Sequence, residues 1–159
     1  MRLSKTFALL PALLSGCVSG ALVRRTIVEA GGLINSPAAG TTVASGATFT
    51  SSYGVRNQCH SGYSPVNFYL LAGKPSTTDV SSSGTFTDPL FHFGNYLVPN
   101  FGLPAMSNPP PPPATFTMPD LEGVGDTEVH FAVVETFLGC PPDGHTEYGL
   151  SANALQYDA

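Results

Sequence analysis

Apolar residues in this chain recur at every second position or gather in short runs, which is the pattern of β-strands. Residues 47–55 alternate as a half-buried strand does, and residues 114–118 alternate again. Residues 66–72 and 127–138 are mostly apolar, and the Thr, Val and Phe content of the second segment favours strand over helix. Weaker strand candidates are residues 32–36, 41–45, 84–87, 91–98 and 148–157. The pattern predicts an all-β protein of seven or eight strands.

Turn-forming residues separate these segments at the spacing of a β-sandwich. The chain has 159 residues, of which 17 are Gly and 15 are Pro, and both residue types break helices. Residues 73–83 and 99–113 are expected to be loops. The five prolines at 109–113 predict a stiff surface segment, in preference to a ligand for a proline-binding domain. A chain of this length is expected to form one domain.

The N-terminus has the features of a secretory signal peptide. A short basic region precedes an apolar stretch over residues 6–18, which is too short to span a bilayer. Small residues follow, so cleavage is expected between Gly20 and Ala21. The dibasic pair Arg24-Arg25 predicts a second cut by a secretory protease. We therefore expect a signal peptide over 1–20, a short pro-segment over 21–25 and a folded domain over 26–159.

A second interpretation of the N-terminus stays open. Residues 14–17 (LSGC) resemble a bacterial lipobox, in which Cys17 would become a lipidated first residue. The dibasic pair and the Ser/Thr-rich body favour a fungal secreted protein instead. The last residues do not form an apolar tail, so a glycolipid anchor signal is not expected.

Processing at the dibasic pair would leave a strongly acidic domain. Four of the six basic residues lie before residue 26, whereas all 11 acidic residues lie after it. Arg56 and Lys74 remain, so the net charge of residues 26–159 is −9 with His neutral. Nucleic-acid binding requires a basic surface, so no nucleic-acid partner is expected. No apolar run is long enough for a membrane-spanning helix, so none is expected either.

Two cysteines, Cys59 and Cys140, lie beyond the signal segment. An even number of cysteines in an oxidising compartment predicts a disulfide between them. Two buried free thiols are the alternative.

The first strand candidates carry a characteristic series of residues, namely an apolar run ending in Ser36-Pro37, then Gly40, Val43, Gly46, and Phe49 through Tyr53. This series resembles the start of the N-terminal Ig-like domain of fungal cell-wall synthesis and surface proteins. Residues 114–157 resemble small secreted proteins of mushroom-forming fungi. The resemblance implies an Ig-like antiparallel sandwich and a location outside the cell or in its wall, and no activity. The chain has no Trp, so it lacks the Cys–Trp–Cys core of a true immunoglobulin domain.

In an Ig-like order of strands, the two cysteines fall in the B–C and F–G loops, at the same end of the sandwich. Their disulfide would bring polar and aromatic residues of both loops together. The candidate binding residues are Arg56, Asn57, His60 and Tyr63 from one loop and Asp143, His145, Glu147 and Tyr148 from the other. The two tyrosine rings could stack on a sugar face while Asn57 and Asp143 bond its hydroxyl groups. A purely structural disulfide between ordinary polar loops is the alternative.

Catalytic and metal-binding patterns are weaker. His60 and His145 near two carboxylates could hold zinc or copper, but no HxH or HxxxH spacing occurs, so no metal or other cofactor is expected. The acidic turn at 120–128 does not match an EF-hand loop. Glu135 and His130 lie on the most apolar segment, but no Gly-x-Ser-x-Gly motif accompanies them.

These observations predict a small secreted binding protein, extracellular or associated with the cell wall, which is more plausibly non-catalytic than an enzyme. A neutral glycan is the expected partner, because a net charge of −9 over residues 26–159 would repel acidic glycans. A secreted polysaccharide-active enzyme or accessory protein, and an effector that binds a host protein, are the alternatives.

Overall fold

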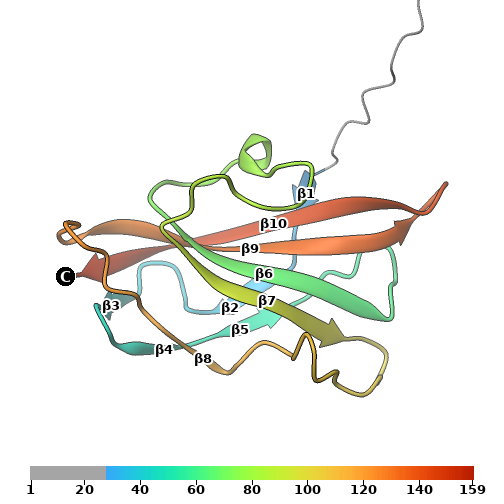
Figure 1. Ribbon diagram of the computed structural model, residues 1–159, viewed down its shortest axis with the longest axis horizontal. Helices are drawn as coiled ribbons and strands as arrows, with labels where there is room; N and C mark the ends of the chain where they lie inside the picture. Colours follow the sequence, from blue (N-terminus) through green and yellow to red (C-terminus); the bar gives the residue numbers. More distant parts are fainter. Residues whose placement is uncertain (1–27) are drawn as a thin grey trace, which may run out of the picture.

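The alternating and apolar segments fold into a β-sandwich, shown in Figure 1 by the computed structural model, which describes residues 28–159. The predicted signal peptide and pro-segment lie outside the described residues, and so do the processing residues Gly20, Ala21, Arg24 and Arg25 and the alternative lipidation site Cys17. Within the described part, no helix is long and apolar enough to cross a membrane.

The two most apolar segments become β6 (Tyr63–Leu71) and β9 (Thr127–Cys140), which pair at the centre of the larger sheet. On its other side, β9 pairs with β10 (His145–Asp158) as a long antiparallel hairpin. Strand β7 (Phe91–Pro99) pairs with the outer side of β6. The far edge of β10 is covered in parallel by two short strands in succession, β1 (Val28–Ala30) and β3 (Thr42–Ala44).

Two short strand pairs form the second layer, which lies below β9 and β10 in the view of Figure 1. They are β2 (Leu33–Ser36) with β5 (Ser52–Gly54), and β4 (Thr48–Thr50) with β8 (Thr115–Thr117). The alternating segment 47–55, which the sequence predicts as one strand, is therefore divided into β4 and β5 with different partners. Eight of the nine candidate segments form strands, and this division and the added β1 bring the number in residues 28–159 to ten, compared with the seven or eight expected.

The main core lies between the two layers and is built largely from phenylalanine. The rings of Phe49, Phe68, Phe116 and Phe131 pack with centroids 5.2 to 6.2 Å apart. Such separations suit edge-to-face and tilted aromatic contacts, which stabilise a core beyond the area that they bury. Every second residue of β6 and β9 points into this core, which explains their apolar period.

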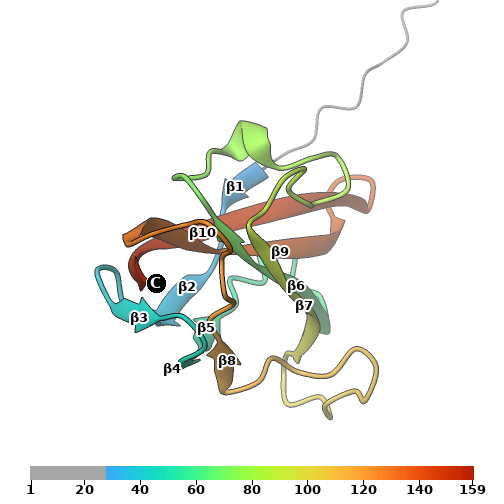
Figure 2. The same ribbon diagram turned by 60° about the vertical axis from the view of Figure 1, so that its left-hand side comes forward.

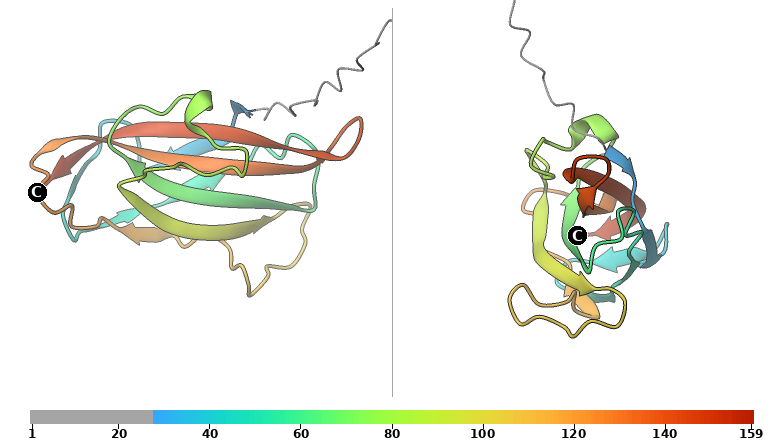
Figure 3. Two further views of the ribbon diagram at one scale, coloured as in Figure 1. Left: turned by 45° about the horizontal axis from the view of Figure 1, so that its top comes forward. Right: turned by 90° about the vertical axis from the view of Figure 1, so that its right-hand side faces the viewer.

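The opposite face of the larger sheet is partly covered by residues 73–90, which include the 3-10 turn η1 (Thr77–Asp79). Figure 3 shows this segment passing over the sheet. Residues 73–83 were expected to be a polar loop, but Val80 within them and Phe86 beyond them are buried against Tyr69 and Tyr148. The expected strand over residues 84–87 is absent from this part of the structure, because the segment covers a sheet face instead of joining an edge.

The connection from β7 to β8, residues 100–113, projects from the sandwich in Figure 2. Its start is fixed by Asn100, whose backbone N–H donates to Gly62 O at 2.9 Å and whose Nδ2 donates to Ser64 Oγ at 3.1 Å. Further along, the backbone N–H of Leu97 donates to Pro110 O at 2.9 Å. The proline run therefore lies alongside the outer edge of β7.

Candidate functional site

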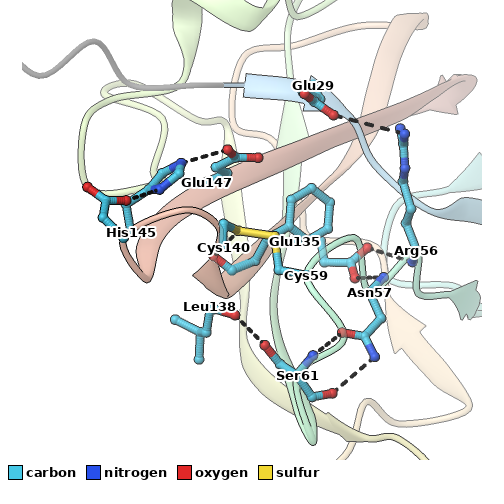
Figure 4. The surroundings of a disulfide bond; sticks show 12 residues. Glu29, Arg56, Asn57, Cys59, Ser61, Glu135, Leu138, Cys140, His145 and Glu147 are labelled. Carbon is cyan, nitrogen blue, oxygen red and sulfur yellow. Dashed lines mark hydrogen bonds and ion pairs between the residues drawn. A yellow bond between two sulfur atoms is a disulfide. The ribbon is translucent and has the colours of Figure 1, made fainter.

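The loop between β5 and β6 is held at one end of the sandwich by a buried carboxylate. Glu135 of β9 is fully buried and points into the interior between the layers. Its Oε2 accepts hydrogen bonds from Arg56 N at 2.9 Å and Tyr53 Oη at 3.0 Å, and its Oε1 accepts one from Asn57 N at 2.8 Å. Figure 4 shows the two backbone contacts. Three donors compensate much of the cost of burying the charge.

Tyr53 extends this network to the second layer. Its hydroxyl accepts a hydrogen bond from Gly32 N at 2.6 Å while donating to Glu135. Burial, and then the negative charge of Glu135, raise the pKa of Tyr53 well above 10, so the hydroxyl keeps its proton and remains a donor. Gly32 has no room for a side chain, because a Cβ there would collide with the carbonyl oxygen of Gly54.

The same loop is closed by its own side chains. Asn57 Oδ1 accepts from Ser61 N at 2.8 Å, and Asn57 Nδ2 donates to Ser61 O at 3.0 Å. Ser61 Oγ then donates to the carbonyl oxygen of Leu138 at 2.6 Å, which attaches the loop to β9. Both the oxygen and the NH₂ group of the Asn57 amide thus bond within the loop, although the sequence suggested this amide as a ligand for sugar hydroxyls.

A disulfide joins this loop to the end of β9, as the cysteine count predicts. Cys59 and Cys140 are bonded, with their Cα atoms 4.9 Å apart, which is within the normal range for a disulfide. Disulfides persist mainly in oxidising compartments, so the bond is compatible with an extracellular location.

Beside the disulfide, His145 lies between two carboxylates. Its Nδ1 is 2.6 Å from Asp143 Oδ1 and its Nε2 is 2.7 Å from Glu147 Oε1. These hydrogen bonds, that to Glu147 first and that to Asp143 second, raise the pKa of His145 above 6.5. Both ring nitrogens donate at once in the protonated imidazole, which is the form that two carboxylates favour.

The structure brings together five of the eight residues predicted for the binding site, namely Arg56, Asn57, Asp143, His145 and Glu147, around the disulfide. The guanidinium of Arg56 is directed away from the sulfurs, because Nη1 donates to Ala30 O at 2.7 Å and Nη2 lies 3.9 Å from Glu29. His60 is exposed on the loop surface and has a left-handed backbone, with φ +56°.

The role predicted for Tyr148 as a sugar-stacking ring is wrong. Successive strand residues point to opposite faces, so Tyr148 and Glu147 diverge. Tyr148 is buried in the second cluster with Phe86, and its hydroxyl donates to Ser82 O at 3.3 Å. A ring covered by residues 73–90 offers no face to a ligand.

Carboxylates of the acidic turn and of the most apolar strand, namely Asp126, Glu128 and Glu135, contact other groups of the protein. Glu135 is occupied by its three donors, and His130 lies at a position of opposite parity on β9, 3.4 Å from Glu128. In the turn, Asp126 Oδ1 accepts a hydrogen bond from Ala159 N at 3.1 Å, which attaches the turn to the last residue.

An exposed apolar surface was not predicted from the sequence. On the connection between β7 and β8, Phe101 is 71% exposed, Leu103 40% and Met106 45%. Tyr63 lies against the same segment, since its hydroxyl donates to Pro104 O at 3.2 Å. We call residues 100–106 with Tyr63 the apolar tip. The sequence signal was the absence of Asp, Glu, Lys and Arg between positions 88 and 120.

Comparisons with protein-family models, curated proteins and solved structures found no match to this chain. The chemistry of the surface must therefore be inferred from its own residues. A depression of about 500 Å³ lies at the other end of β6, where it is lined by Leu71, Lys74, Asp79, Phe86 and Asp88 among others. None of the residues predicted for the binding site lines it.

Proposed function

We propose that the protein is a non-catalytic binding protein that acts outside the cell, at a fungal cell wall, and takes a neutral polysaccharide on its apolar tip. The observation that carries this proposal is the exposure of Phe101 on an anchored, uncharged segment. It replaces the pair of tyrosines first expected, of which Tyr63 remains and Tyr148 is buried.

The exposed side chain of Phe101 stands on a strained backbone. Its φ is +53°, a left-handed conformation that bulky residues rarely adopt. The turn is closed by the hydrogen bond from Leu103 N to Asn100 O at 3.0 Å, and Asn100 is itself fixed to β6 and its preceding loop. Backbone strain of this kind is concentrated at functional positions. A preorganised ring loses little entropy when a sugar ring stacks on it.

Charge supports a neutral ligand. The tip carries no ionised side chain, whereas residues 26–159 as a whole have a net charge of −9. An acidic glycan would be repelled by the domain and would find no cation at the tip. A neutral polymer avoids both effects, and its binding should depend little on salt concentration.

The absence of catalysis is supported by the state of the carboxylates at the disulfide end. Glu135 accepts three hydrogen bonds in the interior, and Asp143 and Glu147 are both bonded to His145. A glycosidase needs two carboxyl groups facing a substrate across an open site. These hydrogen bonds instead join the three groups to other groups of the protein.

Two features support the Ig-like and secreted parts of the proposal. Strand β3 pairs in parallel with the last strand, β10, and the central order β10–β9–β6–β7 joins the last two strands to the middle of the chain. The disulfide between two loops at one end suits a protein exposed to oxidising surroundings.

Sedimentation with insoluble chitin, β-glucan and mannan tests the proposal. We expect at least one of them to retain the protein equally at low and high salt. Phe101→Ala and Tyr63→Ala should each weaken retention, by roughly 1 to 2 kcal/mol per lost ring. Phe91→Ala is the matched control, because Phe91 is 41% exposed at the opposite end of β7.

Retention by none of the three polymers would refute the proposal, as would equal retention of the Tyr63→Ala, Phe101→Ala double variant and the parent. Release of soluble sugars from the retaining polymer would refute the non-catalytic part and favour an enzyme.

A further inference from the structure

The disulfide has an unusual neighbour, because a carboxylate lies next to its sulfur atoms. Cys59 Sγ, Cys140 Sγ and a carboxylate oxygen of Glu147 all lie within 4.8 Å of one another. His145 Nε2 is 2.7 Å from Glu147 Oε1. We propose that these four residues form a latent zinc site, which is closed while the disulfide is intact and binds Zn²⁺ when the disulfide is reduced.

The register of the β9–β10 hairpin explains why these groups share one face. Cys140 pairs with His145 and Phe137 pairs with Glu147, while an irregularity between the two pairs adds one residue to β9. Paired residues in an antiparallel ladder lie on the same face. The hairpin therefore places Cys140, His145 and Glu147 on one face, and Figure 4 shows Cys140 bonded to Cys59 with Glu147 and His145 at one side of the disulfide. The side chain of Glu147 is only 13% exposed.

Reduction should not separate the two cysteines, since hydrogen bonds hold the loop on both sides of Cys59. Before it, the backbone N–H groups of Arg56 and Asn57 donate to Glu135. After it, Ser61 Oγ donates to Leu138 O, and Asn100 Nδ2 donates to Ser61 O at 3.0 Å. The thiols would thus stay beside Glu147 in the folded protein.

The four groups match the preferences of zinc. Zn²⁺ binds Cys thiolate at about 2.3 Å, His nitrogen and carboxylate oxygen at about 2.0 to 2.2 Å, and favours four ligands in a tetrahedron. The free sulfurs would move apart by rotation about their Cα–Cβ bonds to take two corners. Each sulfur is unavailable as a thiolate while the disulfide exists, so the oxidised protein offers no such site.

The imidazole of His145 is already oriented for this role. Its Nδ1 faces Asp143 Oδ1 at 2.6 Å, which leaves Nε2 directed to Glu147, the carboxylate beside the sulfurs. A histidine that binds zinc through one nitrogen commonly donates its other N–H to a carboxylate. Asp143 is therefore the positioning residue of the site.

The electron balance of the switch is simple. A dithiol supplies two electrons and two protons, the disulfide becomes two thiols, and the dithiol becomes a disulfide. Zinc then displaces both thiol protons as it binds. For the experiment a water-soluble phosphine is the better reductant, because dithiols bind zinc themselves. The phosphine and one water molecule reduce the disulfide to two thiols, and the phosphine becomes a phosphine oxide whose oxygen comes from that water.

The test compares zinc binding by the oxidised and the reduced protein after anaerobic removal of the phosphine, by competition with a chromophoric chelator. We expect one equivalent of Zn²⁺ on the reduced protein and none on the oxidised one. Co²⁺ as a spectroscopic substitute should give thiolate charge-transfer bands. Glu147→Gln and His145→Ala should each raise the zinc Kd by about 100-fold or more, and Asp143→Asn by about 10- to 100-fold. Glu122→Gln, at an exposed carboxylate outside the cluster, should leave it unchanged.

Near-UV circular dichroism of each sample shows whether the fold persists. A reduced protein that keeps its native spectrum but binds no zinc would overturn the proposal. Wild-type affinity in both Glu147→Gln and His145→Ala would do so too, because two thiols alone would then account for binding. Loss of the native spectrum on reduction would overturn the argument that the loop holds its place.

Discussion

Replacing Glu135 with Gln should destabilise the domain although the two side chains have nearly the same shape. The carboxylate is fully buried and accepts hydrogen bonds at both oxygens, from Asn57 N at one and from Arg56 N and Tyr53 Oη at the other. An amide has only one oxygen. In either orientation, its NH₂ group must therefore face at least one buried donor.

The magnitude follows from the less costly orientation. With the amide oxygen toward Arg56 and Tyr53, the N–H of Asn57 loses its acceptor, which costs about 1 to 3 kcal/mol for a buried donor. The two remaining hydrogen bonds change from charge-assisted to neutral, and so become weaker. Removing the buried charge offsets part of this loss. We expect a net destabilisation of about 2 to 4 kcal/mol, which lowers the Tm of a domain of this size by roughly 10 °C.

Urea unfolding at neutral pH, followed by tyrosine fluorescence, measures the effect. Glu122→Gln is the control for loss of one negative charge, since Glu122 is exposed, and it should stay within about 0.5 kcal/mol of the parent. A Glu135→Gln variant that unfolds at the same urea concentration as this control would refute the reasoning. A Tyr53→Phe variant should show a non-additive effect with Glu135→Gln, because the two side chains share a hydrogen bond.

Three further predictions concern other parts of the fold. Because the pKa of His145 is raised above 6.5, its protonation stabilises the fold below pH 6.5, and this stabilisation is lost as the pH rises through the folded-state pKa. The Tm of the oxidised, metal-free protein, measured from about pH 5 to 9, should therefore fall with rising pH, and should fall less in His145→Asn. An equal fall in the two proteins would contradict this prediction. Gly84→Ala should lower the free energy of unfolding by about 2 to 4 kcal/mol, because φ is +75° and the new Cβ meets the buried ring of Tyr148. Gly40→Ala, at φ +80° in open space, should lower it by only about 1 to 2 kcal/mol. Equal urea midpoints for the two variants would show that the clash with Tyr148 is absent. The disulfide closes a loop with a sequence separation of 81 and so limits the entropy of the unfolded chain. Its reduction should therefore lower the free energy of unfolding, measured by urea titration, by up to about 4 kcal/mol. An unchanged urea midpoint would contradict this argument.

The all-β sandwich and the disulfide could be predicted because their signals are local or compositional. Alternation with a period of two marks strands, and two cysteines allow a single pairing. The division of residues 47–55 into β4 and β5 could not be predicted, because it depends on which distant strands each half meets. Periodicity identifies a strand and carries no information about its partner.

The candidate site was predicted less well, for reasons that its residues make clear. Tyr148 was misplaced because nothing in the Ser/Thr-rich segment 73–90 showed that Val80 and Phe86 would fold over the sheet. The alternation of Glu147 and Tyr148 could have warned that both cannot face one ligand. Glu135 was noticed as a charge within an apolar strand, but two of its three partners are backbone groups from a loop 78 and 79 residues away, and the third is the hydroxyl of Tyr53.

The proline run beside β7 also bears on whether another chain could add a strand at this edge of the sheet. The outer edge of β7 is a nine-residue strand border where another chain could add by backbone pairing. Leu97 N is already bonded to Pro110 O, and the prolines at 109–113 have no N–H to offer an incoming strand. The opposite border of the sheet is occupied by β1 and β3. Positions 89–119 carry no Asp, Glu, Lys or Arg, so we expect the missing donors of the prolines to hinder strand addition at this edge, where other proteins rely on lysines.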